Sequence, residues 1–273
     1  MMNNKKSKIS EKKFFKLKKI IKEMDSVIIA FSGGSDSSFL LATAAELLGE
    51  KVIAVTAKSP TYPGRELKDA KAIANRLNCR HIIINTDELE LEEFINNPRN
   101  RCYFCKKELF LKLISMKNKY KFNFVADGTN YDDLNTIRPG LKALKELGIR
   151  SPLAEAGLTK EEIRKHSRLL NLSTWNKPAL ACLSSRFPYG EKISKSKLRK
   201  IEKAENFLYS LGFRQIRVRY HHPIARIEIE KEEIPRMLQH NIREKIIKRL
   251  KKMEFEYITL DLEGYRTGSM DKL

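Results

Sequence analysis

The stretch Val27-Ile28-Ile29-Ala30-Phe31-Ser32-Gly33-Gly34-Ser35-Asp36-Ser37-Ser38 decides the fold and carries the first indication of function. Its five leading apolar residues predict a buried strand, which the Ser-Gly-Gly-Ser-Asp-Ser run then interrupts. Residues 39–48 return with helical spacing, so a helix begins around Ser35–Ser38. The unpaired N–H groups and the dipole of such a helix start favour phosphate, and Gly33 and Gly34 let the backbone approach it closely.

Asp36 does not suit a plain anion site, and its carboxylate predicts a Mg²⁺ ion that the phosphates share. The Walker A spacing and its lysine are absent from this stretch. The stretch resembles the SGGxDS loop of the PP-loop ATP pyrophosphatases. That resemblance implies cleavage of ATP between its α and β phosphates, with AMP passed to a carbonyl or carboxylate oxygen. The alternative is an ordinary Gly-rich turn between a strand and a helix.

Composition limits the class of protein. The chain has 273 residues, of which 41% are hydrophobic, and this predicts one large or two modest packed domains. No apolar run approaches the ~20 residues that span a bilayer, and residues 1–8 are polar without a following apolar run. Four cysteines do not predict a secreted disulfide scaffold, so we expect a cytoplasmic protein with no membrane partner.

The formal net charge of +20 is compatible with nucleic-acid binding, with a heat-adapted surface or with a Lys-rich proteome. No RNA-binding signature accompanies the charge, so we do not expect a nucleic-acid partner.

Predicted strands and helices alternate through the first part of the chain. We expect strands over 27–31, 52–57, 81–84 and 122–126, and helices over 10–24, 39–48, 66–77, 103–116 and 159–170. This order predicts an α/β fold with a doubly wound parallel sheet, whose ligands lie at the carboxyl ends of the strands. Those ends carry Ser32–Gly34, Ala57–Ser59 and Asp127–Asn130.

A turn-rich link over 173–190 separates this pattern from a second one. The second pattern is helix 194–211, strand 214–220, strand 225–230, helix 232–250 and strand 257–262. We therefore divide the chain into an ATP pyrophosphatase domain over 1–180, which includes the N-terminal helix, and a smaller α+β domain over 181–273 for substrate binding or oligomerisation.

Nearly the whole chain resembles one branch of the PP-loop proteins, the LarE-type ATP-dependent sulfur transferases. The matching segments are Ala54–Ala57, Tyr62–Leu67, Asn100–Lys106, Asp127–Asp133, Arg138–Gly140, Lys177–Cys182, Ser185–Gly190 and Leu260–Arg266. The resemblance implies that a carboxylate of pyridinium-3,5-dicarboxylate mononucleotide is adenylated and that sulfur replaces AMP. The product is a thiocarboxylate for the nickel-pincer cofactor of lactate racemase.

The resemblance also implies two sets of binding residues. The ATP set is Ser32, Gly33, Gly34, Ser35, Asp36, Ser37, Ser38, Ala57, Arg65, Asp127, Gly128 and Thr129, with Asp36 as the catalytic magnesium ligand. The substrate set is Ser185, Arg186, Glu205, Arg217, Arg219 and Glu228. Without the resemblance, the two glutamates and the arginines would be interpreted as solvated surface charges. Arg217 and Arg219 alternate on a predicted strand, so both could clamp a substrate phosphate from one face.

The cysteines leave three alternatives open. In the one we favour, the thiolates of Cys102, Cys105 and Cys182 hold a [4Fe–4S] cluster whose fourth iron takes a sulfide. In the second, Cys182 donates its own sulfur in a single turnover and becomes dehydroalanine. The third is a disulfide, or a zinc site completed by a histidine. The candidate histidines are His81, His166, His221, His222 and His240. We interpret Cys79 as a buried structural thiol.

Two other functions compete with this one. A PP-loop tRNA thiolase also combines SGGxDS with a Cys-x-x-Cys and a later cysteine, and the positive charge suits tRNA. A nucleotide-sensing or metal-carrier protein would bind ATP without consuming it. For the sulfur transferase we expect sulfide or another sulfur donor as a partner, and a homo-oligomer.

Overall fold

The computed structural model describes residues 2–135, 139–178, 181–266 and 268–270, with side chains from Lys8 onward. The chain forms two compact units. The first comprises Met1–Glu88 and Asn100–Leu180, and the second comprises Leu89–Arg99 and Ala181–Leu273. The second unit therefore includes Leu89–Arg99, which our division at residue 180 places in the first domain.

The sheet of the first unit has four parallel strands in the order β3-β2-β1-β4. They are β1 (Val27–Ala30), β2 (Val52–Lys58), β3 (Arg80–Asn85) and β4 (Phe124–Ala126). In the register of the two central pairs, Val27 lies opposite both Val52 and Phe124. The strand order reverses at β1, so the loop that follows β1 lies at the switch point where such sheets bind ligands.

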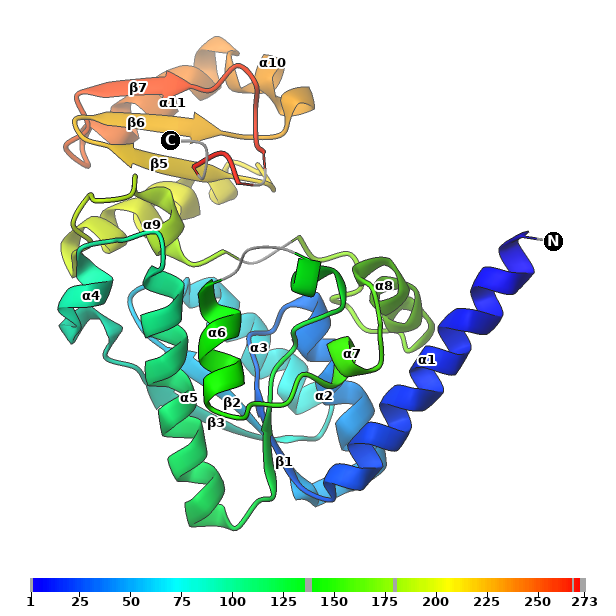
Figure 1. Cartoon of the computed structure of the whole chain (residues 1–273). Coiled ribbons are helices and arrows are strands. Elements are labelled where there is room, and N and C mark those ends of the chain that lie inside the picture. The colour runs from blue at the N-terminus through cyan, green and yellow to red at the C-terminus, as the bar shows by residue number, and fades with distance from the viewer. Residues whose placement is uncertain (1, 136–138, 179–180, 267, 271–273) are drawn as a thin grey trace. The chain divides into compact units, whose positions relative to one another are not determined.

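Helices cover both faces of this sheet, as Figure 1 shows. Alternate residues of β1 separate into two cores, because successive side chains of a strand point to opposite faces. Val27 and Ile29 pack in one core with Leu17 and Phe39, and Ile28 packs in the other with residues of α5 and α6. The predicted α/β fold with a doubly wound parallel sheet is confirmed.

The helices of the first unit follow the predicted order, with two short additions. They are α1 (Met2–Met24), α2 (Ser35–Leu48), α3 (Gly64–Arg76), α5 (Arg101–Tyr120), α6 (Pro139–Glu146), α7 (Pro152–Glu155) and α8 (Lys160–Leu169). α6 and α7, each of which begins at a proline, were not predicted. Within the described residues, no helix is long and apolar enough to cross a membrane.

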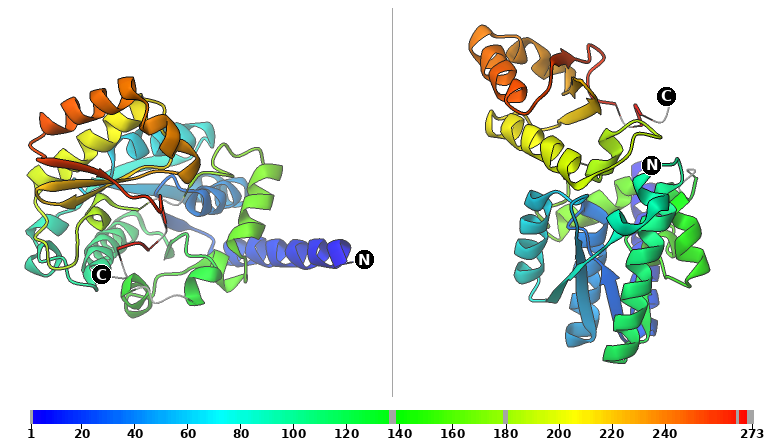
Figure 2. Two further views of the ribbon diagram at one scale, coloured as in Figure 1. Left: turned by 90° about the horizontal axis from the view of Figure 1, so that it is seen from above. Right: turned by 90° about the vertical axis from the view of Figure 1, so that its left-hand side faces the viewer.

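The second unit is a three-stranded sheet with helices, seen from two further sides in Figure 2. Its elements are α4 (Glu92–Ile95), α9 (Lys195–Ser210), β5 (Arg217–His221), β6 (Ile224–Glu228), α10 (Ile234–Met237), α11 (His240–Lys251) and β7 (Tyr257–Leu260). β5 pairs antiparallel with β6, and β6 pairs parallel with β7. α9 contacts β5 and α11 contacts β7, which gives the α+β arrangement.

The single helix predicted over 232–250 is wrong. α10 ends at Met237, Gln239 is extended with φ −56° and ψ 134°, and α11 starts at His240. Pro235 lies in the first turn of α10, where its missing N–H costs no helical hydrogen bond. Hydrophobic spacing continues through both helices, so the pattern alone does not reveal the break.

Candidate active site

The loop after β1 has the backbone of an anion-binding turn. Gly34 is the extended N-cap of α2, with φ −79° and ψ 168°. Gly33 has φ +65°, and a Cβ there would lie 3.1 Å from the Cα and Cβ of Ala70 on α3. A side chain at this position would therefore be strained and would press against α3. Helix geometry gives the N–H groups of the first turn of α2 no partner within the helix, so an anion could bind them.

The serines of the loop have two different roles. The hydroxyls of Ser32 and Ser37 lie 3.1 Å apart, and the Ser37 hydroxyl donates to the carbonyl of Gly34 at 3.3 Å. These contacts hold the turn in shape. The hydroxyls of Ser35 and Ser38 are buried and have no hydrogen-bond partner among the described residues. Buried hydroxyls without partners are uncommon, because leaving a buried polar group unpaired costs free energy. A ligand that forms hydrogen bonds with these two hydroxyls would remove that cost.

Tyr62 supports the loop from the segment that follows β2. Its hydroxyl donates to the carbonyl oxygen of Ser32 at 2.6 Å. Burial and the nearby carboxylates of Glu66 and Asp69 raise the pKa of Tyr62, so its hydroxyl keeps its proton. The resemblance places Tyr62 in a matching segment, but the sequence alone does not indicate this contact.

The carboxylate of Asp36 forms an ion pair at one of its two oxygens. Its Oδ2 accepts hydrogen bonds from Lys160 Nζ at 2.5 Å and from Asn130 Nδ2 at 3.3 Å. Its Oδ1 is buried and has no hydrogen-bond partner among the described residues. A carboxylate oxygen beside a phosphate-binding helix start is a ligand that Mg²⁺ prefers, so Asp36 fits the predicted ion.

The loop after β4 closes against the start of α2. A Cβ on Gly128 would lie 2.9 Å from the backbone nitrogen of Ser37, so this contact requires glycine. Asp127 accepts hydrogen bonds from the Thr129 hydroxyl at 2.6 Å and from the Ser151 hydroxyl at 2.7 Å. The structure thus brings the predicted residues Asp127, Gly128 and Thr129 to the loop, where Asp127 orders the turn.

The other two predicted ATP residues lie on neighbouring elements of the first unit. Ala57 is near the carboxyl end of β2, and Arg65 is in the first turn of α3. Arg65 Nε lies 3.3 Å from Oε1 of the buried Glu66. The ammonium of Lys177 lies 2.8 Å from Glu66 Oε2, so two cations share this carboxylate.

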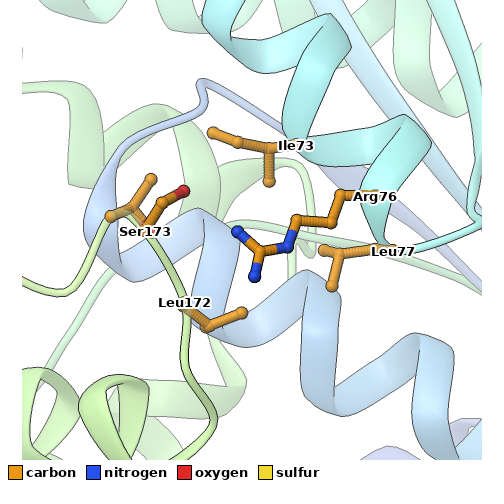
Figure 3. A pocket seen from close by; sticks show the side chains of 6 residues that line it. Ile73, Arg76, Leu77, Leu172 and Ser173 are labelled. Carbon is orange, nitrogen blue, oxygen red and sulfur yellow. The ribbon is translucent and has the colours of Figure 1, made fainter.

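A small pocket occurs further along α3, shown in Figure 3. Its volume is about 20 Å³. It is lined by Ile73, Arg76, Leu77, Leu172, Ser173 and Thr174. Pockets for small molecules are typically ~300–1,000 Å³, so this one is too small for a nucleotide.

Cys102 and Cys105 are the second and fifth residues of α5, so both lie near its start. Cys102 is exposed and Cys105 is half-buried, and neither forms a disulfide within the described structure. Gly140 of α6 lets the two helices approach, because a Cβ there would lie 3.1 Å from Lys106 Cγ and 3.6 Å from the Cys102 carbonyl. Arg138, just before this glycine, lies outside the described residues.

Cys182 belongs to the second unit, where it precedes the short helical turn Leu183–Arg186 and is half-buried. Cys79 is half-buried against the core that contains α2, and burial raises the pKa of its thiol, as expected for a structural cysteine. Among the described residues, no group of three or more His, Cys, Asp or Glu side chains is placed to hold one metal ion. The cluster and the zinc site therefore both stay predictions.

Five of the six candidate substrate residues are buried, Ser185 is half-buried, and two of the arginines pair with the two glutamates. Arg186 and Glu205 form a bidentate ion pair, with Nε–Oε1 at 2.9 Å and Nη2–Oε2 at 3.0 Å. Their exposed fractions are 1% and 2%, so the interpretation of Glu205 as a surface charge is wrong. The Arg186 guanidinium also donates to the Cys182 carbonyl at 3.0 Å and to the Ser185 hydroxyl at 3.0 Å, which fixes the start of the turn.

A second buried ion pair joins β5 to β6. Arg219 donates to Glu228 at 2.6 Å, and also to the carbonyl of Ser185 and the hydroxyl of Ser269, each at 2.9 Å. Glu228 is fully buried and accepts a further hydrogen bond from Arg226 at 3.1 Å. The interpretation of Glu228 as an exposed charge is therefore also wrong.

Arg217 and Arg219 lie on the same face of β5, since they are two residues apart on one strand. Arg217 donates to the carbonyl of Ile216 at 2.7 Å and packs on the ring of Tyr265, 5.0 Å from its centre. Burial and the nearby guanidinium of Arg186 lower the pKa of Arg217. Four guanidiniums, those of Arg186, Arg217, Arg219 and Arg226, lie in one unit with three carboxylates, those of Glu205, Glu228 and Asp261. An excess of positive charge of this kind favours an anionic ligand.

The Arg186–Glu205 pair gives the first testable prediction. Glu205→Ala is expected to lower the free energy of unfolding by about 3–5 kcal/mol, because it leaves the buried guanidinium of Arg186 without its counter-ion. Urea denaturation followed by circular dichroism measures this change. Lys203→Ala, at an exposed position of the same helix, is the control and is expected to stay within about 0.5 kcal/mol of the unmodified protein.

The same pair predicts a dependence on pH. Burial opposes ionisation of Glu205, but the Arg186 guanidinium outweighs it and holds the pKa of Glu205 below its ordinary value. The stabilisation is therefore fully present above the pKa of the unfolded chain and is lost as the pH falls through the lower folded value. A Glu205→Ala variant that unfolds with unchanged acid sensitivity and stability would contradict the role of this pair.

Comparisons with known proteins agree with this geometry. The profile of the asparagine synthase family matches residues 22–98, which include β1, the loop and α2. An uncharacterized protein of Synechocystis is 43% identical, covering 96% of this chain and 98% of that protein. The pyridinium-3,5-bisthiocarboxylic acid mononucleotide synthase of Lactiplantibacillus plantarum is 37% identical, covering 92% and 91% of the two chains. A tRNA-specific 2-thiouridylase of Rickettsia africae is 26% identical over 57% of this chain and 53% of that enzyme.

The fold and the loop define a PP-loop enzyme that uses ATP. More narrowly, the chain belongs to the LarE family and is an ATP-dependent sulfur transferase. Three residues that the structure brings to the loop are absent from the predicted ATP set, namely Tyr62, Asn130 and Lys160. Lys160 follows Thr159, which forms a capping box with Glu162. That motif marks the helix start but does not indicate where the Lys160 side chain lies.

Proposed function

We propose that this enzyme adenylates a carboxylate of pyridinium-3,5-dicarboxylate mononucleotide and replaces AMP by sulfur, giving a thiocarboxylate for the nickel-pincer cofactor. The similarity over nine-tenths of the chain to a synthase named for the bisthiocarboxylic product carries this proposal. The tRNA thiolase alternative has weaker support, because that similarity is lower and covers 57% of the chain.

In the first half-reaction, a substrate carboxylate oxygen attacks the α-phosphorus of ATP, and the bond to the β-phosphate oxygen breaks. The N–H groups at the start of α2 and the glycines of the loop bind the departing pyrophosphate. Asp36 would hold a Mg²⁺ ion, which supplies positive charge to the phosphates. Tyr62 and Gly128 keep the loop in the required shape.

In the second half-reaction, a sulfur nucleophile attacks the carbonyl carbon of the acyl-adenylate, and AMP leaves with the electron pair of the C–O bond. Water competes for the same carbon, so the sulfur donor must be in place beforehand. Cys182, Cys102 and Cys105 are the candidate sulfur carriers. Thiolates are the usual ligands of a [4Fe–4S] cluster that could take a sulfide, so such a cluster stays one alternative for these cysteines, and donation of the Cys182 sulfur stays the other. The sulfide source, the homo-oligomer and the cytoplasmic location remain predictions.

Within the second unit, the excess of guanidinium charge supports a site for the phosphate of the mononucleotide. Arg186 and Arg219 are each paired with a glutamate, so they position the neighbouring groups. Arg217 is the guanidinium of β5 that we assign to the substrate phosphate. Ser185, which donates to the Cys182 carbonyl at 2.9 Å, lies beside this group of charges.

Arg217→Met tests this assignment. The variant is expected to raise the KM for the pyridinium nucleotide about 10–100-fold and to change the KM for ATP less than about twofold, since a phosphate clamp serves one ligand. The same change at Arg219 would remove the nearer of the two guanidiniums that pair with the buried Glu228 and is a poorer test. Steady-state release of AMP measures both constants. Equal effects on the two ligands would mean that Arg217 is structural.

A further inference from the structure

The PP-loop of this enzyme contains no lysine or arginine over residues 32–38, although it must bind a highly charged triphosphate. Lys160 brings an ammonium to the loop from 124 residues further along the chain. Its Nζ lies 2.5 Å from Asp36 Oδ2, and the side chains of the two residues are 31% and 18% exposed. The pair is therefore within reach of a ligand that binds at the loop.

The backbone of Lys160 is fixed. It is the first residue of α8, whose capping box joins Thr159 and Glu162. Its own N–H donates to the carboxylate of Asp132 at 2.8 Å, and Lys13 forms an ion pair with Glu162 at 2.8 Å. The four-carbon side chain of Lys160 can move while its base stays in place, so the ammonium can exchange one oxygen for another a short distance away.

Magnesium-bound ATP would provide a cation for Asp36 and phosphate oxygens for Lys160. When Asp36 binds Mg²⁺ through its unpartnered Oδ1, the metal neutralises the carboxylate and repels the ammonium. Phosphate oxygens next to the metal then become the stronger partner for Lys160. We propose that Lys160 is a phosphate-binding residue, which Asp36 holds in the ATP-free site and which moves to the ATP phosphates when Mg–ATP binds.

The alternative is that Lys160 merely neutralises Asp36. Calorimetric binding of Mg²⁺ with α,β-methylene-ATP, an analogue that cannot be cleaved, distinguishes the two. We expect Lys160→Met to weaken binding of this analogue about 10–100-fold, Lys160→Arg to restore much of the loss, and adenosine binding to stay unchanged. Lys165→Met, an exposed position on the same helix, removes the same charge and is expected to bind like the unmodified protein.

A second arm uses ATP without Mg²⁺. Asp36→Asn removes the carboxylate that holds Lys160, so this variant is expected to bind metal-free ATP several-fold more tightly than the unmodified protein, and adding Lys160→Met is expected to abolish the gain. The inference rests on the ATP site of the proposed function but not on sulfur transfer, so failed thiolation would leave it intact. Lys160→Met with unchanged affinity for the analogue, or with equal losses for adenosine and the analogue, would overturn it.

Discussion

Asp36→Ala is expected to abolish pyrophosphate release while the protein stays folded. The carboxylate lies at the start of α2 with one buried oxygen that has no partner in the described structure. Removing it takes away the carboxylate that we propose as the magnesium ligand, and we expect the rate to fall at least about a thousandfold. Its loss also leaves Lys160 without its partner, but this side chain is part-exposed, so the cost to stability is small.

Pyrophosphate release with saturating ATP measures this effect, and circular dichroism shows whether the variant is folded. Glu46→Ala is the matched control, because it removes an exposed carboxylate from the same helix. It is expected to release pyrophosphate at the unmodified rate. A folded Asp36→Ala variant that releases pyrophosphate normally would refute the assignment of the loop.

Replacement of Cys102, Cys105 or Cys182 by alanine is expected to abolish sulfur transfer and to leave substrate adenylation intact. A cluster site needs all three thiolates, whereas ATP binding depends on the loop after β1. Each variant is also expected to lose its iron. Cys79→Ala is the control, because its half-buried thiol packs against the core and has no role in the proposed chemistry.

Anaerobic purification followed by iron and sulfide analysis provides the measurement. We expect about four of each per chain in the unmodified protein, and repeated turnover when sulfide is supplied. The opposing result comes from intact mass. A protein without iron that loses the mass of one H₂S after a single turnover would mean that Cys182 gave up its own sulfur.

The layered fold of the first unit could be predicted from short-range pattern. Val27, Ile28 and Ile29 are all apolar because β1 is covered on both faces, and the Gly-rich turn follows at once. The loop residues are contiguous, so one stretch of sequence shows the whole turn. The break between α10 and α11 could not be predicted in this way, since the hydrophobic spacing continues through both helices. The proline in the first turn of α10 is compatible with one continuous helix and does not mark the break.

Contacts between distant residues limited the prediction of the site. Lys160 reaches Asp36 through the packing of α8, and local pattern shows the capping of that helix but not its neighbours. Glu205 and Glu228 look like surface charges in sequence, because their burial depends on arginines that other segments supply. The resemblance identified these residues, and the structure shows that both glutamates are partners of buried guanidiniums.

Transfer of sulfur to an activated carboxylate is the central step of the proposed reaction, and product analysis tests it most directly. Purified protein is incubated with Mg–ATP, sulfide and pyridinium-3,5-dicarboxylate mononucleotide, and the nucleotide is examined by mass spectrometry. We predict exchange of a carboxylate oxygen for sulfur, with one AMP and one pyrophosphate formed for each sulfur transferred. ATP cleavage that leaves the nucleotide unmodified while tRNA acquires sulfur would contradict the account.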